Sequence, residues 1–427
     1  MAHYGIVAPP AVGHLAGLGS LGCELKRRGH QVTVFSGERA EFMTQRLALP
    51  FCNYTDDDKA VRLIHQPMLL AASCLGLRIS MVMRVRFAYW ADQALRRLPE
   101  KLREAQVDAL LVDRTQLAVG TVAEHLGLPF ATVSTGVLWN EEVGVPPHCT
   151  GWSYGEGRWP LLRNRLGYAA WHLFLGPALT TINRFRRGHG LKPLKEVNDA
   201  FSPLAQLSQM CSELDFPRSH LPRNFHYIGS LSGGRPEQTA DFPWDQLDGR
   251  PLIYASVGTV HDRRCFQAFP KIAAACAGID AQLVIALGKW RDDRPDGGQA
   301  LRNLPGNPIV VGFAPQIALL EKASLLITHA GANTVLEALN AGVPMVALPR
   351  AVDQPAMSAR VVQSGVGVRA SFRSFQPSAL RQQILQVLSD PSFRERARRI
   401  GAALRAAGGV QRAADLVEQL LPVGPSK

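Results

Sequence analysis

The stretch from Leu325 to Asp353 reads LLITHAGANTVLEALNAGVPMVALPRAVD and decides how this chain folds. An apolar strand stops at Thr328 and His329, and a helical pattern begins near Asn333. A second apolar run, Pro344 to Leu348, follows that helix. A strand, a turn containing glycine, a helix and another strand form the repeating unit of a parallel α/β sheet.

The turn inside this stretch has the features of a phosphate site. Gly331 lets the backbone approach a ligand closely because it has no side chain. The helix offers unpaired N–H groups near Asn333 and Thr334 and the positive end of its dipole. His329 can donate to the same diphosphate, and Glu337, on the same helix face as Asn333, can bind paired ribose hydroxyls. Each feature alone is common in structural turns, so the prediction rests on their combination.

The same rhythm extends outward to both ends of the chain. Further strands are predicted at 3–8, 31–35, 107–113, 129–134, 252–256, 282–287 and 309–312, with helical patterns between most of them. Glycines, prolines and acids interrupt all periodicity over residues 229–249. We therefore predict an α/β protein with two Rossmann-like parallel-sheet domains, residues 1–230 and 251–427, joined by a linker at 231–250 and facing each other across a cleft. We also expect the last helix to pack back on the first domain.

A second candidate centre lies in the first half. His14 follows the first strand, at the edge of the sheet where ligands of α/β proteins collect. Its near-neutral pKa suits removal of a proton from a hydroxyl group. Asp113 ends the Val107 strand and could accept the Nδ1 proton of His14. The alternative is a capping histidine and an ordinary strand-end aspartate. His30, in a helix-to-strand turn, is expected to be solvated.

Composition excludes several classes of protein. Of the 427 residues, 46% are hydrophobic and 19% charged, which is typical of a globular protein. The seven cysteines form no C-x-x-C pair, so neither a zinc site nor a disulfide framework is indicated. The net charge of +12 is spread over both halves and would suit an acidic small substrate or an anionic membrane face. Simple solubility explains it equally well, and nucleic acid is not the favoured partner.

Metal binding and membrane insertion are not predicted. Asp56, Asp57 and Asp58 match an Asp-x-Asp metal motif, but they lie in a polar loop, where a solvated turn is the simpler interpretation. No leader peptide is recognised near Met1. The uncharged run from Leu166 to Asn183 contains glycines, a proline and a histidine, so it favours a buried or interfacial helix over a spanning one. We expect a cytoplasmic protein with free thiols.

The joint pattern of residues 313–354, called the donor region below, closely resembles the signature of family-one glycosyltransferases. These enzymes are UDP-dependent and have two facing Rossmann-like domains (the GT-B fold). The matching segments are Phe313-Ala314-Pro315-Gln316, His329 to Thr334, Glu337, Gly342-Val343-Pro344 and Asp353-Gln354. Ser256-Val257-Gly258-Thr259 resembles the Ser-x-Gly-Ser/Thr loop of the family, which lies near the phosphates. The resemblance implies an inverting enzyme with a nucleotide-sugar co-substrate, no metal and no other cofactor.

The resemblance also assigns roles to the matching residues. It implies that Phe313 stacks on uracil, with Ala314 beside it, and that Gln316 bonds the edge of the base. His329, assisted by the N–H groups of Asn333 and Thr334, would hold the diphosphate, next to the loop of Ser256, Gly258 and Thr259. Glu337 would bind the ribose. Asp353 and Gln354 would bind the sugar, and a glutamine at this last position is associated with glucose. His14 and Asp113 match the catalytic base of the family and its orienting acid.

One departure from the family pattern weakens the assignment of the nucleobase. The family usually has tryptophan where this chain has Phe313, and a smaller ring stacks less strongly. The distance from Phe313 to His329 is also two residues shorter than in plant members. Uridine remains the expected base. The alternative is that Phe313 is an ordinary core aromatic following a strand.

Resemblance outside the donor region points to an acceptor. The segments 107–113, 201–209 and 213–218 are similar to those of bacterial zeaxanthin glucosyltransferases, and the layout is similar over almost the whole chain. This implies transfer of glucose from UDP-glucose to the two ring hydroxyls of zeaxanthin. Apolar stretches at 69–83 and 166–179 and arginines interleaved with aromatics at 78–97 fit a hydrophobic acceptor and peripheral contact with an anionic membrane, although core packing and a solvated helix explain them too.

Three other functions remain open. The chain could glycosylate a different hydrophobic acceptor, such as a macrolide, a flavonoid or a sterol. It could be a nucleotide-sugar epimerase with the same fold, although an epimerase needs no separate acceptor and its site is rich in acids. It could also be a pigment-binding protein without catalysis, which would not need His14, Asp113 and Glu337 together.

Overall fold

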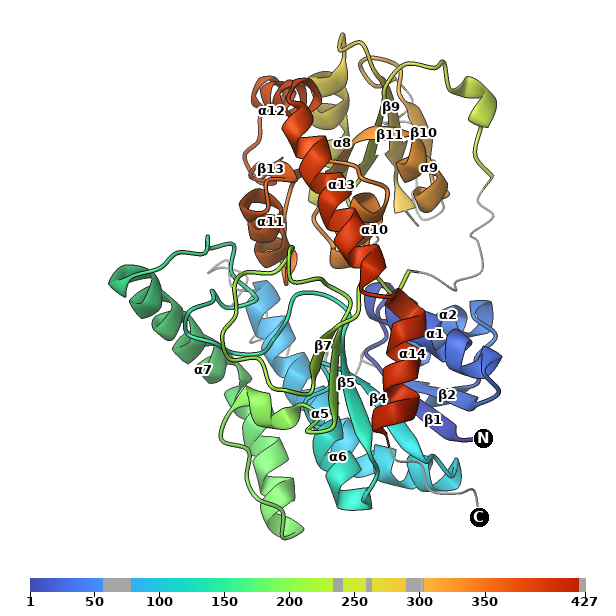
Figure 1. The fold of residues 1–427 in the computed structure, drawn as a ribbon, viewed down its shortest axis with the longest axis vertical. Coiled ribbons are helices and arrows are strands. Elements are labelled where there is room, and N and C mark those ends of the chain that lie inside the picture. The colour runs from blue at the N-terminus through green and yellow to red at the C-terminus, as the bar shows by residue number, and fades with distance from the viewer. Residues whose placement is uncertain (57–77, 233–240, 259–262, 289–300, 302, 422–427) are drawn as a thin grey trace.

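Two parallel β-sheets, one above the other in Figure 1, form the centres of the two halves of the molecule. The computed structural model describes residues 1–56, 78–232, 241–258, 263–288, 301 and 303–421. The first sheet has seven strands in the order β3-β2-β1-β4-β5-β6-β7, and the second has six in the order β10-β9-β8-β11-β12-β13. Neighbouring strands pair in parallel in both sheets. The predicted α/β fold with two parallel sheets is confirmed.

The first half alternates strands with helices, as the sequence predicted. Its elements are β1 (His3–Val7), α1 (Val12–Arg27), β2 (Gln31–Ser36), η1 (Glu38–Ala40), α2 (Glu41–Arg46), β3 (Phe51–Asn53), α5 (Arg78–Glu104), β4 (Ala109–Asp113), α6 (Val119–Leu126), β5 (Phe130–Ser134), α7 (Arg158–Gly188), η2 (Val197–Ala200), β6 (Ala205–Ser208) and β7 (Phe225–Tyr227). Strand β4 is buried along its whole length because helices cover both faces of a parallel sheet.

The second half repeats the alternation of strands and helices. Its elements are η3 (Trp244–Gln246), β8 (Leu252–Ser256), α8 (Arg263–Cys276), β9 (Gln282–Ala286), β10 (Ile309–Val311), α9 (Gln316–Lys322), β11 (Ala323–Thr328), α10 (Ala332–Asn340), β12 (Met345–Ala347), α11 (Gln354–Gln363), β13 (Gly367–Arg369), α12 (Pro377–Ser389), α13 (Pro391–Ala406) and α14 (Gly409–Leu420). The sequence did not predict β3, β6, β7 and β13, which are only three or four residues long.

The chain returns to the first half at its end. Helix α13 spans the second half, and α14 turns down to lie beside α1 (Figure 1). Apolar residues of α14, among them Val410, Ala413 and Val417, belong to the same buried core as β1 and α1. The Arg28 guanidinium bonds both Asp415 and Glu418 at 2.7 Å.

The expectation that His30 is solvated was wrong. Its Nε2 lies 2.8 Å from Glu418 on α14, and its Nδ1 accepts a hydrogen bond of 3.2 Å from the backbone N–H of Ala2. Only 17% of its side chain is exposed. The helix-to-strand turn is covered by α14, a segment almost 400 residues further along the chain, which local sequence could not show.

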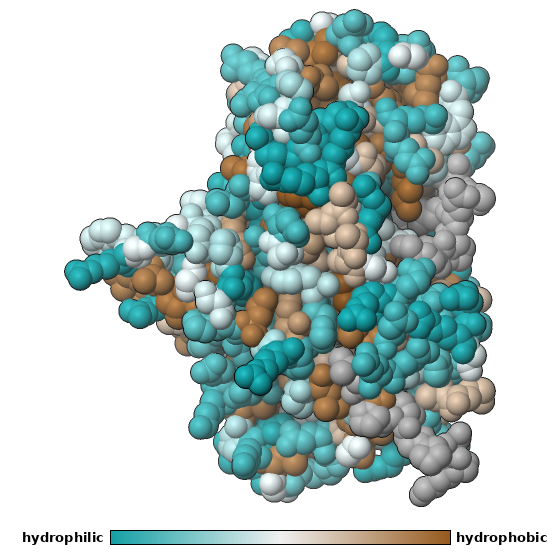
Figure 2. Space-filling view, in the orientation of Figure 1, coloured by the Kyte–Doolittle hydropathy of each residue, from teal (hydrophilic) through white to brown (hydrophobic). Residues whose placement is uncertain are grey.

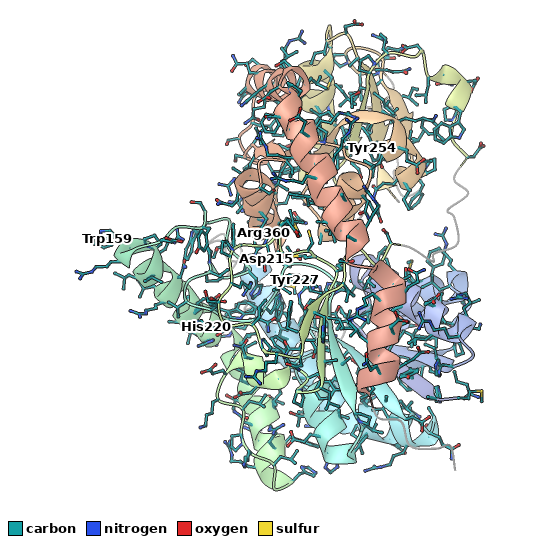
Figure 3. The ribbon with its side chains drawn as sticks, viewed as in Figure 1. Trp159, Asp215, His220, Tyr227, Tyr254 and Arg360 are labelled. Carbon is teal, nitrogen blue, oxygen red and sulfur yellow. The ribbon has the colours of Figure 1, made fainter. Side chains whose placement is uncertain are left out.

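A buried ion pair joins the two halves near their centre. The Arg360 Nε on α11 donates to Asp215 Oδ1 at 2.7 Å, and Arg218 Nε donates to Asp215 Oδ2 at the same distance. The Tyr227 hydroxyl donates to Asp215 Oδ2 at 3.0 Å (Figure 3). Arg360 also lies over the Phe216 ring, 4.3 Å from its centroid. Burial alone would raise the pKa of Asp215, but Arg360 and Arg218 lower it to about 2.

Removal of this carboxylate should destabilise the protein strongly. We expect Asp215→Ala to lower the free energy of unfolding by about 3–5 kcal/mol, because two buried arginines lose their counter-ion. Chemical denaturation at pH 7 measures the effect. Asp248→Ala is the matched control: Asp248 pairs with Arg250 on the surface, so its loss should cost about 1 kcal/mol or less.

The contribution of Asp215 should also depend on pH. Its pKa is depressed in the folded protein, so its stabilisation is complete above about pH 4, the pKa of an unfolded aspartate. It should then fade as the pH falls toward 2, and the stability of Asp215→Ala and of the parent should converge there. A difference that stays constant from pH 7 to pH 2.5 would contradict this assignment.

Candidate active site

His14 and Asp113 meet at the topological switch point of the first sheet, where the strand order reverses between β1 and β4. Strand β1 has β2 on one side and β4 on the other, so the loops after β1 and β4 diverge and leave a crevice between them. His14 lies in the first turn of α1, directly after β1, and Asp113 is the last residue of β4. His14 Nδ1 is 2.8 Å from Asp113 Oδ2. The structure therefore brings together two residues that lie 99 positions apart.

The Asp113 carboxylate is fully buried and every contact favours its ionised form. The Thr115 N–H and hydroxyl donate to its Oδ1 at 2.9 and 2.6 Å. The Thr135 hydroxyl donates to its Oδ2 at 3.0 Å. Burial alone would raise the pKa of Asp113, but His14, Arg114 and Thr115 hold it well below its usual range. Asp113 is thus an anion that orients the His14 ring through its Nδ1.

The second sheet places the candidate phosphate residues at its own reversal point. Strand β8 lies between β9 and β11, and the loops after β8 and β11 carry Ser256, Gly258, His329 and Gly331. A Cβ on Gly258 would lie 2.7 Å from His329 Nε2, and a Cβ on Gly331 would collide with the same imidazole. The histidine is held between two glycines, and no larger residue fits at either position. Thr259 lies outside the described residues.

Helix α10 begins directly beside this imidazole. Gly331 is its N-cap residue, so the N–H groups of Ala332, Asn333 and Thr334 form its first turn, with no acidic side chain among them. Ala330, between the histidine and the cap, has φ of 62°, a conformation that costs a non-glycine residue about 1–3 kcal/mol. Strain of this kind in a loop facing a helix N-terminus is consistent with a ligand site.

The Asn333 side chain joins the two centres. Its Nδ2 donates to the Gly13 carbonyl oxygen at 2.8 Å, and its Oδ1 accepts from Gln209 Nε2 at 2.8 Å. Gly13 precedes the candidate base directly. The side chain of Asn333 is therefore used between the halves, which leaves its backbone N–H for the phosphate role that the family resemblance implies.

The candidate ribose and base residues form a second hydrogen-bonded group. Gln316 Nε2 donates to Glu337 Oε2 at 2.5 Å and lies 3.4 Å from the Thr334 hydroxyl. The buried Tyr254 hydroxyl donates to Gln316 Oε1 at 3.3 Å. Glu337 is 7% exposed, so only the edge of its carboxylate can meet a ligand.

Phe313 is not a core aromatic. It follows β10 and is 45% exposed, beside a surface hollow that it lines together with Gln246 and Gly288. Ala314, its neighbour, is buried in the core of the second half. An exposed ring is available to stack on a planar ligand, which the alternative interpretation from sequence did not allow.

The candidate sugar residues differ in how they are placed. Asp353, the N-cap residue of α11, reaches across to the first half, where Arg114 Nη2 donates to its Oδ2 at 3.2 Å. Gln354 turns back, and its Oε1 accepts from the backbone N–H groups of Arg350 and Ala351 at 3.0 and 3.2 Å. Its amide oxygen is thus used within the loop.

Three residues of this region were missed in the sequence. Thr135 bonds the candidate base, and Arg114 and Gln209 bond Asp353 and Asn333 of the opposite half. Thr135 follows β5, the strand beside β4, so the rule that gave Asp113 would also have found it. No sequence signal links Arg114 to Asp353, which is 239 residues away. Gly136 packs so closely on this pair that a Cβ would lie 2.5 Å from Asp353 Oδ2.

No metal is implied by these side chains. Within the described part of the chain, no group of three or more histidine, cysteine or acidic residues has the geometry of a metal site. Asp56 pairs with Arg97 at 2.6 Å, and Asp57 and Asp58 lie outside the described residues.

Comparison with known proteins gives the chain close relatives. The profile of the family UDP-glucoronosyl and UDP-glucosyl transferase matches residues 192–405. The chain is 35% identical to a zeaxanthin glucosyltransferase of Pantoea ananas over 99% of its own length and 97% of the relative's. It is 36% identical to a zeaxanthin glucosyltransferase of Pseudescherichia vulneris, covering 99% and 98%.

Solved structures support the fold. The structure of CalG4, the calicheamicin glycosyltransferase, superimposes with a TM-score of 0.76 at 22% identity and full coverage of both chains. The glycotransferase of kitacinnamycin superimposes with a TM-score of 0.74 at 24% identity and 99% coverage of both. At these identities the likeness concerns the arrangement of the two sheets.

The two glycines around His329 give a direct test of the candidate phosphate site. We expect Gly258→Ala to weaken the binding of UDP about ten-fold or more, which corresponds to at least about 1.4 kcal/mol, because the new methyl group displaces the imidazole. Isothermal titration measures it. Gly127→Ala is the control: Gly127 also has a positive φ, of 66°, but no atom lies within 4 Å of a Cβ there. It should lose stability and keep its affinity for UDP.

Proposed function

The chain belongs to the UDP-glucoronosyl and UDP-glucosyl transferase family, and from this premise we propose that it transfers glucose from UDP-glucose to the ring hydroxyls of zeaxanthin, first one and then the other. The observation that carries the catalytic part is the hydrogen-bonded His14–Asp113 pair. Gly13, directly before His14, accepts a hydrogen bond from Asn333 in the first turn of α10. The acceptor and the sugar are supported by the two relatives, each named a zeaxanthin glucosyltransferase.

In the proposed reaction His14 is the general base. Its Nε2 takes the proton of the acceptor hydroxyl as the oxygen attacks the anomeric carbon of glucose. The bond from that carbon to the diphosphate breaks, and UDP leaves with its electron pair. Attack from the face opposite to UDP inverts the configuration, so an α-linked donor gives a β-glucoside. The buried anion Asp113 stabilises the imidazolium that forms.

The leaving group needs stabilisation of negative charge in the second half. We assign this role to the N–H groups at the start of α10 together with His329, since a helix N-terminus stabilises a phosphate and needs no metal to do so. Gln316 and Glu337 are assigned to the uridine, with Phe313 stacked on the base. Ser256, Gly258 and Thr259 are assigned to the loop around the diphosphate.

The sugar is assigned to the seam between the halves. Asp353 and Gln354 are the proposed ligands of the glucose hydroxyls. Arg114 is proposed as a positioning residue, because its guanidinium holds the Asp353 carboxylate and lies 5.8 Å from the centroid of the Trp139 ring. In this arrangement residues 1–230 bind the acceptor and residues 251–427 bind the donor, with residues 231–250 as the linker.

The place of action follows from the proposed acceptor. Among the described residues no helix is both long enough and apolar enough to pass through a bilayer. We propose that the protein works in the cytoplasm, in peripheral contact with a membrane in which the carotenoid is dissolved.

A panel of donors and acceptors tests the function. UDP-glucose with zeaxanthin should give the mono- and then the diglucoside, with release of UDP that depends on the acceptor. Turnover of macrolides or flavonoids but never of a hydroxylated carotenoid would refute the acceptor. Conversion of UDP-glucose without any acceptor would favour an epimerase, and pigment binding without UDP release would favour a non-catalytic protein.

The assignment of His14 as the catalytic base gives a further prediction. His14→Ala should lower kcat about 10²–10⁴-fold with little change in the affinity for UDP, because the base acts only in the transition state. Asp113→Asn should also lower kcat, since the neutral amide stabilises the imidazolium less. His220→Ala, at an exposed histidine of the same half, is the control and should keep the parental rate. A His14→Ala protein with near-parental kcat would refute the assignment.

The proposed positioning role of Arg114 gives another prediction. Arg114→Gln should raise the KM for UDP-glucose about ten-fold and lower kcat less, because Asp353 loses its partner. If Arg114 acts through Asp353, then Arg114→Gln should add almost nothing to the effect of Asp353→Ala in a double-mutant cycle. Arg369→Gln is the control: Arg369 also joins the two halves, by a bond to the Gly151 carbonyl, and should leave the KM unchanged. Additive effects would refute the coupling.

A further inference from the structure

Helix α7 carries a row of apolar side chains on its outer face. Trp159 is 81% exposed, Leu162 45%, Leu166 63% and Leu173 71%. They follow one another at spacings of three, four and seven residues, so they lie along one face of the helix. We call these four residues the α7 ridge. Single exposed apolar residues are ordinary, but a continuous row that includes a tryptophan marks a contact surface.

The α7 ridge is separate from the face of α7 that packs into the hydrophobic core. The opposite face of the helix already packs into the protein against α5, with Tyr168, Trp171 and Leu175 buried. In Figure 1 the first turns of α7 project sideways from the body, and Trp159 lies at the outer tip (Figure 3). Brown, hydrophobic surface is visible on the same projection in Figure 2. The helix is therefore apolar on two opposite faces, and the described residues of the chain cover one of them.

The charge of α7 indicates what kind of surface the α7 ridge would bind. Residues 158–188 contain six arginines and no aspartate or glutamate. Arg158 and Arg165 are exposed and flank the α7 ridge, and Arg163 lies over the Trp152 ring at 5.0 Å. An apolar row with a tryptophan at its end and arginines along its sides is complementary to the boundary between anionic headgroups and acyl chains.

We propose that the α7 ridge binds the surface of an anionic lipid bilayer. The four apolar side chains enter the boundary between headgroups and acyl chains, and Arg158 and Arg165 meet the lipid phosphates. This deepens the proposed function and rests on it in one respect: the ridge gives the enzyme a reason to stand where a bilayer-dissolved acceptor is. The active site, built from β1, β4 and α10, stays outside the bilayer.

A second copy of the chain fits the same surface less well. Two ridges that pack antiparallel about a two-fold axis would bring the Arg165 side chains of both copies together near the middle of the row, with no acid on either helix to offset them. Lipid phosphates offset these charges, whereas an identical helix repeats them.

The first experiment measures binding of the full chain to vesicles, without any turnover. The parent should bind vesicles with 30% phosphatidylglycerol in phosphatidylcholine in a flotation assay, and bind pure phosphatidylcholine more weakly. A variant with Trp159→Ser, Leu166→Ser and Leu173→Ser should partition at least about ten-fold less to both. Arg158→Gln and Arg165→Gln should each cost about five-fold on the anionic vesicles only.

Matched controls come from the second half. Leu385→Ser removes an apolar side chain that is 42% exposed on α12, and Arg399→Gln removes an exposed arginine on α13. Both should bind vesicles like the parent. A parent that does not bind anionic vesicles, or a ridge variant that binds them equally well, overturns the proposal. A parental dimer in light scattering that the ridge variant dissociates, with no lipid binding, assigns the surface to a second copy instead.

The second experiment separates this proposal from the proposed function. Glucosylation is measured with zeaxanthin embedded in anionic vesicles and with zeaxanthin in detergent micelles. The ridge variant should lose at least about ten-fold in rate with vesicles and keep the parental rate with micelles. An enzyme that binds vesicles through α7 but glucosylates no carotenoid in either medium would refute the acceptor and leave the membrane surface standing. Equal loss of rate in both media would refute the role of the ridge in delivery.

Discussion

The hydrogen bond from Asn333 Nδ2 to the Gly13 carbonyl oxygen joins the two halves at the topological switch points of both sheets, where the strand order reverses. Each parallel sheet leaves a crevice at its own reversal point, because the loops on either side diverge. In the first sheet the crevice holds His14 and Asp113, and in the second it holds His329 and Gly331. The Asn333 bond holds these crevices next to each other, so the candidate base and the candidate phosphate site lie together although they belong to different sheets.

The seam between the halves is polar beside the candidate base and holds a paired carboxylate where it is buried. Arg114 and Asp353 meet beside the candidate base, with Gly136 packed against both. Further along the seam, the buried Asp215 carboxylate pairs with the buried guanidinium groups of Arg218 and Arg360. Arg360 lies on α11, and α11 begins with Gln354 and has Asp353 as its cap. The buried pair therefore stabilises the fold and also fixes the helix that presents the candidate sugar residues.

How much could be read from the sequence depended on the range of each interaction. The strands at 109–113 and 323–328 are continuous apolar runs, so their place in a buried parallel sheet was evident. The glycine turn before α10 and the polar residue at the end of β4 are local signals as well. The short strands β3, β6 and β7 gave no such signal, because their sequences FCN, AQLS and FHY contain polar residues. The equally short β10 and β12 read IVV and MVA and were predicted as apolar runs.

The sequence by itself determined the fold class, the family and which residue types stand at the strand ends, since all of these are encoded in short stretches of neighbouring residues. Only the tertiary structure decided that Arg114 holds Asp353, that α14 covers His30, and that the apolar row of α7 faces outward. These facts depend on contacts between segments far apart in the chain. Periodicity shows that a helix has two faces, but only the packing of its neighbours shows which of them is buried.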